Sequence, residues 1–278
     1  CISYSSVLDL FGGSGFVSMS FKLLGKKVIY NDLLTSSFIN ACACVENDGI
    51  ALTETEKEYL LNTKELTEPY PFFKKYQDRF TEKEMLFLSN FSHNIEKITF
   101  YNNKSPIFEE AIFKSALAQV SIQNHIIDNC FVGGRLNSGQ VLAKLDHRLN
   151  HARNKGAGMP LHKITWIEPL KGQNGCRAIN ADAFHLLEIY EKPIYGFGPR
   201  DLVYIDPPYG GGQSDYAYMY GFFEEYLYQN RMYLLYWRPE TDSVDEPDGY
   251  TLGTARMEYL KEVSKKFAAG KDYEIHFD

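Results

Sequence analysis

The chain has 278 residues, of which 44% are hydrophobic, and this length suits one large domain or a core domain that carries a sizeable insertion. The first residues lack the basic and apolar segments of a secretory signal, and nowhere do about eighteen apolar residues follow one another. We therefore predict a cytoplasmic protein with no membrane partner. Because Cys1 is not a methionine and a strand-like segment follows almost at once, we expect the sequence to begin inside a longer protein.

The charge balance argues mildly against a nucleic-acid partner, because phosphate binding depends mainly on lysine and arginine and the formal net charge is −7. Net charge averages over regions, however. The stretch from Lys144 to Lys163 contains several lysines, arginines and histidines, and Asp146 is its one acidic residue. One segment is thus basic inside an acidic protein.

The cysteines indicate no metal centre. Five are present, and they form no CxxC pair and no Cys/His cluster with metal-ligand spacing. We therefore predict neither a metal site nor a disulfide framework, and we expect Cys42 and Cys44 to be buried packing residues.

In chain order, the first thirty residues predict a strand, a glycine turn, a helix and a second strand. Residues 6–10 are apolar, residues 12–15 are rich in glycine, and residues 16–24 have a helical pattern that Gly25 ends. Residues 27–30 then form a second apolar run. This is the opening of an α/β fold.

The middle of the chain is predicted to be mostly helical. Capping-box spacing indicates helix starts at Thr53 with Glu56 and at Thr81 with Glu84. Helical patterns also cover residues 115–129 and 138–153. Residues 35–170 therefore contain few strand signals.

The α/β pattern resumes in the last hundred residues. Residues 177–180 predict a short strand that leads to Asp182, and residues 184–190 have a helical pattern. Residues 202–205 form a continuous apolar run of the kind expected for a strand buried on both faces.

The first glycine turn, Asp9-Leu10-Phe11-Gly12-Gly13-Ser14-Gly15, has a nucleotide-binding pattern between a strand and a helix. It fails as a dinucleotide motif, because Ser18 occupies the place of the third glycine, and it fails as a P-loop, because no Gly-Lys-Ser/Thr follows. An ordinary structural turn is the alternative.

Asp32 follows the second predicted strand, roughly 20 residues after the glycine turn. A carboxylate at this place is able to accept hydrogen bonds from both vicinal hydroxyls of a ribose. The alternative is a turn aspartate, since Asn-Asp pairs favour turns.

Asp206-Pro207-Pro208-Tyr209 carries the strongest signal. Two prolines directly after a strand end its pairing and stiffen the backbone, so Asp206 and the Pro207 carbonyl are held at the carboxyl edge of the sheet. These two acceptors match the two N–H donors of an exocyclic amine, and Tyr209 offers a ring for stacking, worth ~1–3 kcal/mol. The alternative is a proline-rich turn.

With these motifs in this order, the chain resembles the N6-adenine DNA methyltransferases of the Asp-Pro-Pro-Tyr class, which include restriction-modification and Dam-like enzymes. The family's first motif is an acidic residue followed by Phe-x-Gly-x-Gly, and its later strands end in further acids. The matching residues are Asp9, Phe11, Gly13, Gly15, Asp32, Asp182 and Asp206-Pro207-Pro208-Tyr209.

The resemblance implies an enzyme that uses S-adenosyl-L-methionine and has a doubly wound, Rossmann-like α/β fold with a helical insertion. Residues 1–34 and 171–278 would form the catalytic domain, and residues 35–170 an inserted element that is a candidate for DNA recognition. The implied reaction is direct methyl transfer to N6 of an adenine flipped out of the duplex, with no metal.

The resemblance also assigns a role to each matched residue. By the resemblance, Asp9, Phe11, Gly13 and Gly15 would bind the methionine part of the cofactor, Asp32 the ribose and Asp182 the adenine amine. The residues that would bind the target adenine are Asp206, Pro207, Pro208 and Tyr209.

Double-stranded DNA is the partner that the resemblance implies, and a cognate restriction endonuclease is a further candidate. Candidates for DNA contact are Lys144, Arg148, Arg153 and Lys155 on phosphates, Arg135 in a groove, and Tyr216 on a base. The alternative for the charged stretch is a solvated helix face.

Three other functions compete with this prediction. The nearest is the same chemistry on cytosine N4 or on adenine in RNA. A second is a non-catalytic DNA-binding subunit that retains the fold, against which the intact motifs argue. The third, a Rossmann oxidoreductase, is disfavoured by the missing glycine.

Overall fold

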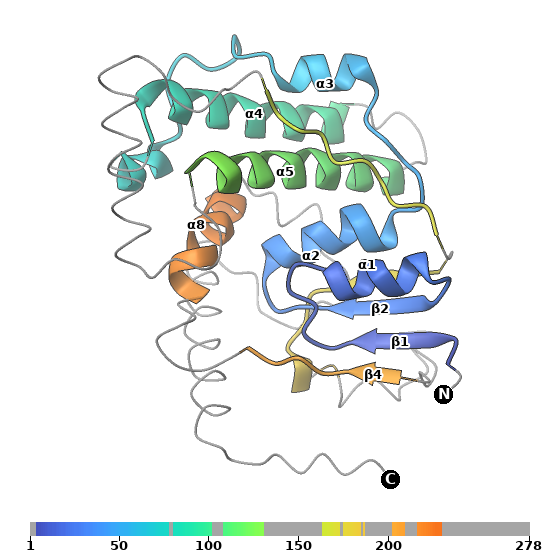
Figure 1. Ribbon diagram of the computed structural model, residues 1–278. Coiled ribbons are helices and arrows are strands. Elements are labelled where there is room, and N and C mark those ends of the chain that lie inside the picture. The colour runs from blue at the N-terminus through green and yellow to red at the C-terminus, as the bar shows by residue number, and fades with distance from the viewer. Residues whose placement is uncertain are drawn as a thin grey trace. The chain divides into compact units, whose positions relative to one another are not determined.

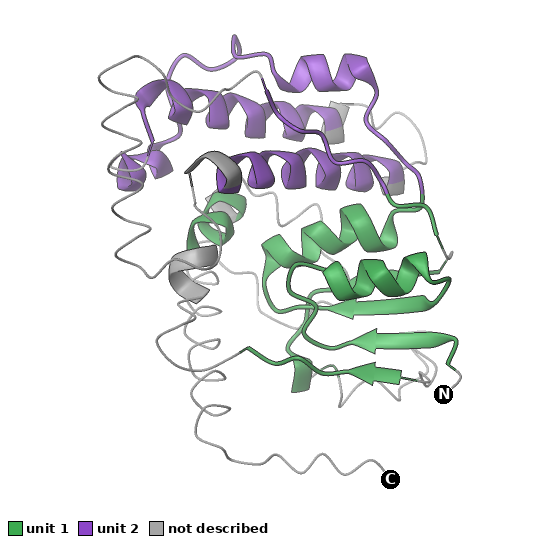
Figure 2. Ribbon diagram, viewed as in Figure 1, with its two compact units in different colours: residues 1–48, 170–278 green, residues 49–169 purple. Residues whose placement is uncertain are grey.

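A computed structural model describes residues 4–77, 80–101, 108–130, 163–172, 175–184, 186, 202–208 and 216–229. The chain divides into two compact units, coloured separately in Figure 2. Unit 1 consists of residues 1–48 and 170–278, and unit 2 of residues 49–169.

Unit 1 contains a parallel four-stranded sheet with the order β3-β2-β1-β4 (Figure 1). Its strands are β1 (Ser6–Asp9), β2 (Lys27–Asn31), β3 (Arg177–Ile179) and β4 (Leu202–Tyr204). The predicted α/β class is therefore confirmed as helices combined with a parallel sheet. In the register of β1, Asp9 is paired with Tyr30 on one side and with Tyr204 on the other.

Glycines set both ends of the helix that joins β1 to β2. Helix α1 (Phe16–Leu23) begins after Gly15, whose φ of 75° lies in the left-handed region. Gly25, with a φ of 74°, follows its end, and the Gly25 amide donates to the Lys22 carbonyl at 2.9 Å. The predicted strand–turn–helix–strand opening is confirmed, with the helix one residue shorter than expected.

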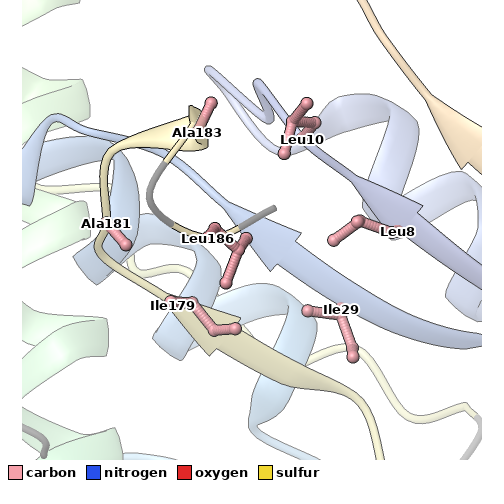
Figure 3. Close-up of a cluster of buried hydrophobic side chains, with 7 residues drawn as sticks. All are labelled: Leu8, Leu10, Ile29, Ile179, Ala181, Ala183 and Leu186. Carbon is pink, nitrogen blue, oxygen red and sulfur yellow. The ribbon is translucent and has the colours of Figure 1, made fainter. Parts of the chain in front are cut away.

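The sheet is buried on both faces at its centre, because β1 and β2 alternate apolar side chains to either side. One face carries a cluster that combines Leu8, Ile29 and Ile179 with residues that follow the strands (Figure 3). Val7, Val28 and Tyr30, which alternate with these, are completely buried as well.

Strand β4 differs from the prediction. We expected residues 202–205 to be buried on both faces, and this is wrong: Leu202, Val203 and Tyr204 are half-buried, and Ile205 is 39% exposed. The reason is position, because β4 is the edge strand of the sheet in the described part of the chain.

Three further helical segments belong to unit 1. Helix α2 (Thr35–Ala41) runs directly into a short π-helical turn, η1 (Cys42–Glu46), and α8 (Tyr216–Gln229) contacts α2. Cys42 and Cys44 are buried free thiols in η1, as predicted. Because α2 contacts β2 and β3, and η1 contacts β3, residues 35–48 group with the sheet.

The regular elements that the structure describes in unit 2 are all helices. It contains α3 (Glu54–Leu60), the 3-10 helix η2 (Pro71–Tyr76), α4 (Glu82–Tyr101) and α5 (Phe108–Cys130). Both capping boxes are confirmed: the Thr53 amide donates to Glu56 at 2.8 Å, and the Thr81 amide donates to Glu84 at 2.7 Å.

The two units divide the chain after residues 48 and 169, whereas the predicted domains divide it after residues 34 and 170. Compact units within one chain need not be independent domains, so the domain assignment stays a prediction. None of the described helices is both long enough and apolar enough to cross a membrane.

Candidate functional site

A cavity of about 270 Å³ opens at the carboxyl ends of the strands of unit 1. The carboxyl edge is where open parallel sheets bind ligands, because the loops that follow the strands meet there. Segments that follow each of the four strands line it. The predicted site residues in its wall are Asp9, Phe11, Gly13, Asp32, Asp206, Pro207 and Pro208.

The glycine turn is packed tightly against the second strand. The Gly12 amide donates to the Asn31 carbonyl at 2.8 Å, and the Tyr30 hydroxyl donates to the Gly13 carbonyl at 2.7 Å. A Cβ atom on Gly12 would overlap the Tyr30 ring, so this turn accepts no side chain there. Gly15 is not among the described residues of the cavity wall, and it instead provides the left-handed start of α1.

Asp9 ends β1 and faces the cavity with an incompletely bonded carboxylate. The Ser18 hydroxyl of α1 donates to Asp9 Oδ2 at 2.6 Å, whereas Oδ1 is buried and has no hydrogen-bond partner among the described residues. Burial raises the pKa of Asp9 to about 6, with the Ser18 bond opposing and the charge of Asp206 adding to the rise. A buried acceptor without a donor is an unusual feature that a bound donor would satisfy.

Ser18 is thus a site residue that sequence reasoning missed. Its only sequence signal was negative, because it occupies the place of the third glycine of a dinucleotide motif. In the structure, the Ser18 side chain is completely buried and fixes the orientation of the Asp9 carboxylate.

Asp32 forms the turn hydrogen bond that one interpretation predicts, and it also lies in the cavity wall. Its Oδ1 accepts from the Leu34 amide at 2.8 Å, which is the hydrogen bond of a turn aspartate, and its Oδ2 accepts from the Gly13 amide at 2.7 Å. Burial raises the pKa of Asp32 to about 6, although both amides oppose the rise. Each carboxylate oxygen keeps a second lone pair that is able to accept a ligand hydroxyl.

Asp206, Pro207 and Pro208 follow the edge strand β4 into the cavity wall. The Asp206 charge contributes to the raised pKa of Asp9, so the two carboxylates lie close enough to repel each other. Tyr209 lies outside the described residues.

Asp182 takes a different place from the other matched acids. Its Oδ1 accepts from the Phe184 amide at 2.7 Å, and its carbonyl accepts from the Leu186 amide at 2.9 Å, so it starts a helical turn. The cavity wall contains its neighbours Ala181, Ala183 and Phe184 but not Asp182 itself. Its role toward a ligand stays a prediction.

Two exposed aromatic rings in the cavity wall were also missed. Phe16 at the start of α1 is 71% exposed and Phe184 is 37% exposed, and both line the cavity. Large apolar side chains left open in this way suit the flat face of an aromatic ligand.

The candidate DNA contacts are not tested by the described residues. Arg135, Lys144, Arg148, Arg153 and Lys155 lie outside them, and Tyr216 is described only as the first residue of α8. In the described part of the chain, no group of three or more His, Cys, Asp or Glu residues is placed to hold a metal ion.

Comparison with known proteins bears directly on this site. Residues 2–121 match the model of the D12 class of N6 adenine-specific DNA methyltransferases. The predicted resemblance to N6-adenine DNA methyltransferases is confirmed over these residues, which are less than half of the chain. The match contains the glycine turn and Asp32, and it ends before Asp206.

A curated relative extends the similarity along the chain. The Type II methyltransferase M2.HphI of Haemophilus parahaemolyticus is 25% identical over 241 residues, which are 81% of this chain and 65% of that protein. The chain therefore spans 65% of the length of this relative, just under two thirds. No solved structure matches the chain significantly.

Proposed function

We propose that this chain is a DNA methyltransferase that uses S-adenosyl-L-methionine and modifies the N6 amine of adenine. The observation that carries the proposal is one cavity at the carboxyl edge of the sheet, into which Asp9, Asp32 and Asp206 converge from the ends of three strands. The family match over residues 2–121 and the name of the curated relative support the same activity.

The residues of the cavity fit the cofactor. The unpartnered Asp9 Oδ1 suits a positively charged group of the methionine part, and Asp32 retains lone pairs for the two ribose hydroxyls. The apolar rings of Phe16 and Phe184 suit the adenine. S-adenosyl-L-methionine supplies an electrophilic methyl group on a sulfonium.

The chain contributes position and polarisation to the transfer. Asp206 and the Pro207 carbonyl accept the two N–H groups of the target amine, which exposes the nitrogen lone pair, and Tyr209 stacks on the flipped base. S-adenosyl-L-methionine held in the cavity would supply the methyl group to the N6 atom, and the amine would release one proton to solvent. The stiff Pro207-Pro208 backbone keeps the acceptors at the sheet edge.

The finer architecture is part of the proposal. Helices on both faces would complete a doubly wound, Rossmann-like sheet, and the helical region would be an insertion that contacts double-stranded DNA. The basic stretch from Lys144 to Lys163 supplies the charge that a net acidic protein needs for this partner. The restriction partner implied by the resemblance would share the same DNA site.

Labelled methyl transfer to DNA tests the proposal. Wild type, Asp206→Ala and an exposed-site control, Glu58→Gln, are incubated with labelled S-adenosyl-L-methionine and varied duplexes, and the nucleosides are separated by chromatography. We expect N6-methyladenine from the wild type and the control, and at least a 100-fold lower rate from Asp206→Ala, because the amine loses a transition-state acceptor.

Calorimetry on the same proteins separates binding from chemistry. Asp206→Ala is expected to keep cofactor binding, so that the loss lies in the transfer step. Equal rates for wild type and Asp206→Ala would refute the mechanism, labelled N4-methylcytosine would refute adenine as the target, and absence of cofactor binding would favour a non-catalytic subunit.

A further inference from the structure

Helix α2 starts without a capping side chain of its own. Its N-cap residue, Leu34, is apolar, and the first amides of any helix lack partners within the helix. An apolar N-cap normally leaves these donors to water or to another part of the protein. Thr35 and Ser36, at the start of α2, are both buried, so water is not their partner.

Glu224 of α8 supplies the missing acceptors. The Thr35 amide donates to Glu224 Oε2 at 3.1 Å, and the Ser36 amide donates to Glu224 Oε1 at 2.8 Å. Glu224 is completely buried and lies 189 residues after Thr35 in the sequence. Hydrogen bonds to a buried charged acceptor are among the stronger ones in proteins.

The helix start that Glu224 holds is also part of the cavity wall. Leu33, Leu34 and Ser37 line the cavity together with Asp32. The Leu34 amide goes to Asp32 Oδ1, so three consecutive amides, those of residues 34 to 36, are taken by two carboxylates. Glu224 thus holds the backbone of residues 35 and 36, directly after the Leu34 amide that binds Asp32.

Helix α8 also carries buried aromatic side chains. Phe222 and Phe223 are almost completely buried, and the Phe222 ring stacks on that of Tyr226 with 5.8 Å between centroids. These aromatic residues pack the helix as core residues, while Glu224 gives it a polar connection to α2. Along the chain, α8 follows the Asp206-Pro207-Pro208-Tyr209 segment.

We propose that Glu224 is a positioning residue that holds Asp32 and the start of α2 in the shape that binds the cofactor, and that ties α8 to this shape. The identity of the ligand rests on the proposed function, whereas the tie itself rests on the two hydrogen bonds. Glu224 touches neither cofactor nor substrate, and it acts through the backbone of residues 34 to 36.

Glu224→Gln tests the tie, with Glu84→Gln as the matched control. Glu84 is also a buried carboxylate that caps a helix, because it accepts from the Thr81 amide at 2.7 Å, but it lies in unit 2. One oxygen of Glu84 accepts both Thr81 bonds, so glutamine keeps an acceptor there, whereas both oxygens of Glu224 accept amides and glutamine turns an NH₂ group toward one of them. The control therefore removes a buried carboxylate of unit 2, and Glu224→Gln in addition leaves an amide of α2 without its acceptor.

Hydrogen exchange of the ligand-free proteins gives the first readout. We expect at least tenfold faster exchange at residues 33–38 in Glu224→Gln and no change there in Glu84→Gln. Equal exchange of this segment in wild type and Glu224→Gln would overturn the tie. This result does not depend on whether the cofactor is identified correctly.

Calorimetry with S-adenosyl-L-methionine gives the second readout, at a temperature where all variants are folded. We expect about tenfold weaker binding by Glu224→Gln and less than twofold change in Glu84→Gln. Unchanged binding by Glu224→Gln, or equal weakening in both, would overturn the positioning role. A wild type that binds no cofactor would refute the proposed function instead, and the exchange result would still decide the tie.

Thr35→Pro is the second variant, for the case in which Glu224→Gln does not fold. Proline removes the Thr35 amide, is well tolerated at the first position of a helix, and suits the extended backbone of Leu34, whose ψ is 129°. We expect a three- to tenfold weaker binding of the cofactor. Full affinity in this variant would contradict the proposal.

Discussion

The cavity carboxylates Asp9 and Asp32 of unit 1 and the half-buried carboxylate Glu56 of unit 2 have opposite surroundings. In the cavity of unit 1, burial raises the pKa of Asp9 and of Asp32 to about 6, and no lysine or arginine of the described residues pairs with either. In unit 2, burial would raise the pKa of Glu56, but the Thr53 amide and Lys114 outweigh it and lower that pKa. The fold therefore stabilises the ionised form of Glu56, whereas ionised Asp9 and Asp32 lower the stability of the folded state.

This difference separates a binding site from a scaffold. A carboxylate that the protein leaves buried and incompletely bonded lowers the stability of the folded state, and such groups concentrate at functional sites. Asp9, whose Oδ1 has no partner among the described residues, fits this description, and Glu56, which is bonded to Thr53 and Lys114 within unit 2, does not. A cationic ligand would give unit 1 the charge that Lys114 gives unit 2.

Asp9→Asn is expected to produce the largest change, in the pH dependence of stability. The folded-state pKa of about 6 lies above the ordinary value of 3.8, so wild-type stability falls as the pH rises from about 4 and the cost is complete above about 6. The variant lacks this group. The free energy of unfolding of Asp9→Asn minus that of the wild type should therefore increase by about 2–3 kcal/mol between pH 4 and pH 8.

Denaturant unfolding at several pH values measures this difference, and Glu58→Gln, which removes an exposed carboxylate of unit 2, serves as control. The Ser18 hydrogen bond survives, because an asparagine oxygen still accepts it. Parallel stability curves for wild type and Asp9→Asn would mean that Asp9 carries no such cost, and the comparison of the two units would then be wrong.

The same contrast explains which features the sequence predicts. The capping boxes at Thr53 and Thr81, the glycine turn and the acids at strand ends are local patterns, so a few neighbouring residues determine them. The places of Asp9, Asp32 and Asp206 around one cavity follow from those patterns, because the carboxyl ends of parallel strands meet at one edge.

Local sequence patterns do not predict contacts between residues that belong to different elements. Ser18 bonds Asp9 because α1 packs beside β1, which the local sequence does not indicate. Glu224 is 189 residues away from Thr35 of α2 and lies in a helix whose sequence indicates only an aromatic core. The half-buried state of β4 depends on which strands flank it, and an apolar run has the same composition at the edge and at the centre of a sheet.

Cofactor binding should itself depend on pH, with an effect of intermediate size. If a cation binds beside ionised Asp9, binding must displace a proton at low pH, since the pKa of Asp9 is about 6. The affinity for S-adenosyl-L-methionine should therefore rise by up to about tenfold per unit below pH 6 and level off above it. Calorimetry from pH 5 to pH 7 measures the slope.

Asp9→Asn is the control for this dependence as well. It should bind the cofactor more weakly at pH 7 and show a flatter profile, because only Asp32 is left to titrate in the same range. A wild-type affinity that stays constant between pH 5 and pH 7 would argue against a cation beside Asp9.

The smallest effect is expected in unit 2, from Glu56→Gln. Glu56 Oε2 accepts from the Thr53 amide at 2.8 Å and Oε1 accepts from the Lys114 ammonium at 2.9 Å, so glutamine keeps an acceptor for the cap and breaks the ion pair. Its lowered pKa means that Glu56 contributes stability at pH values above the ordinary 4.5 and loses it as the pH falls. We expect unit 2 to lose about 1 kcal/mol at pH 7.

Fluorescence of Trp166, which stacks on Phe91 in unit 2 with 6.2 Å between centroids, reports this unfolding. Replacing the second tryptophan by Trp237→Phe leaves Trp166 as the sole reporter. Glu54→Gln is the matched control, because Glu54 is 85% exposed and its pair with Lys57 should add little. Since Glu56 is ionised and bonded in the fold, its removal should cost stability at pH 7, whereas removal of Asp9 relieves a cost. A stabilising Glu56→Gln would therefore erase the distinction between the scaffold acid and the site acids.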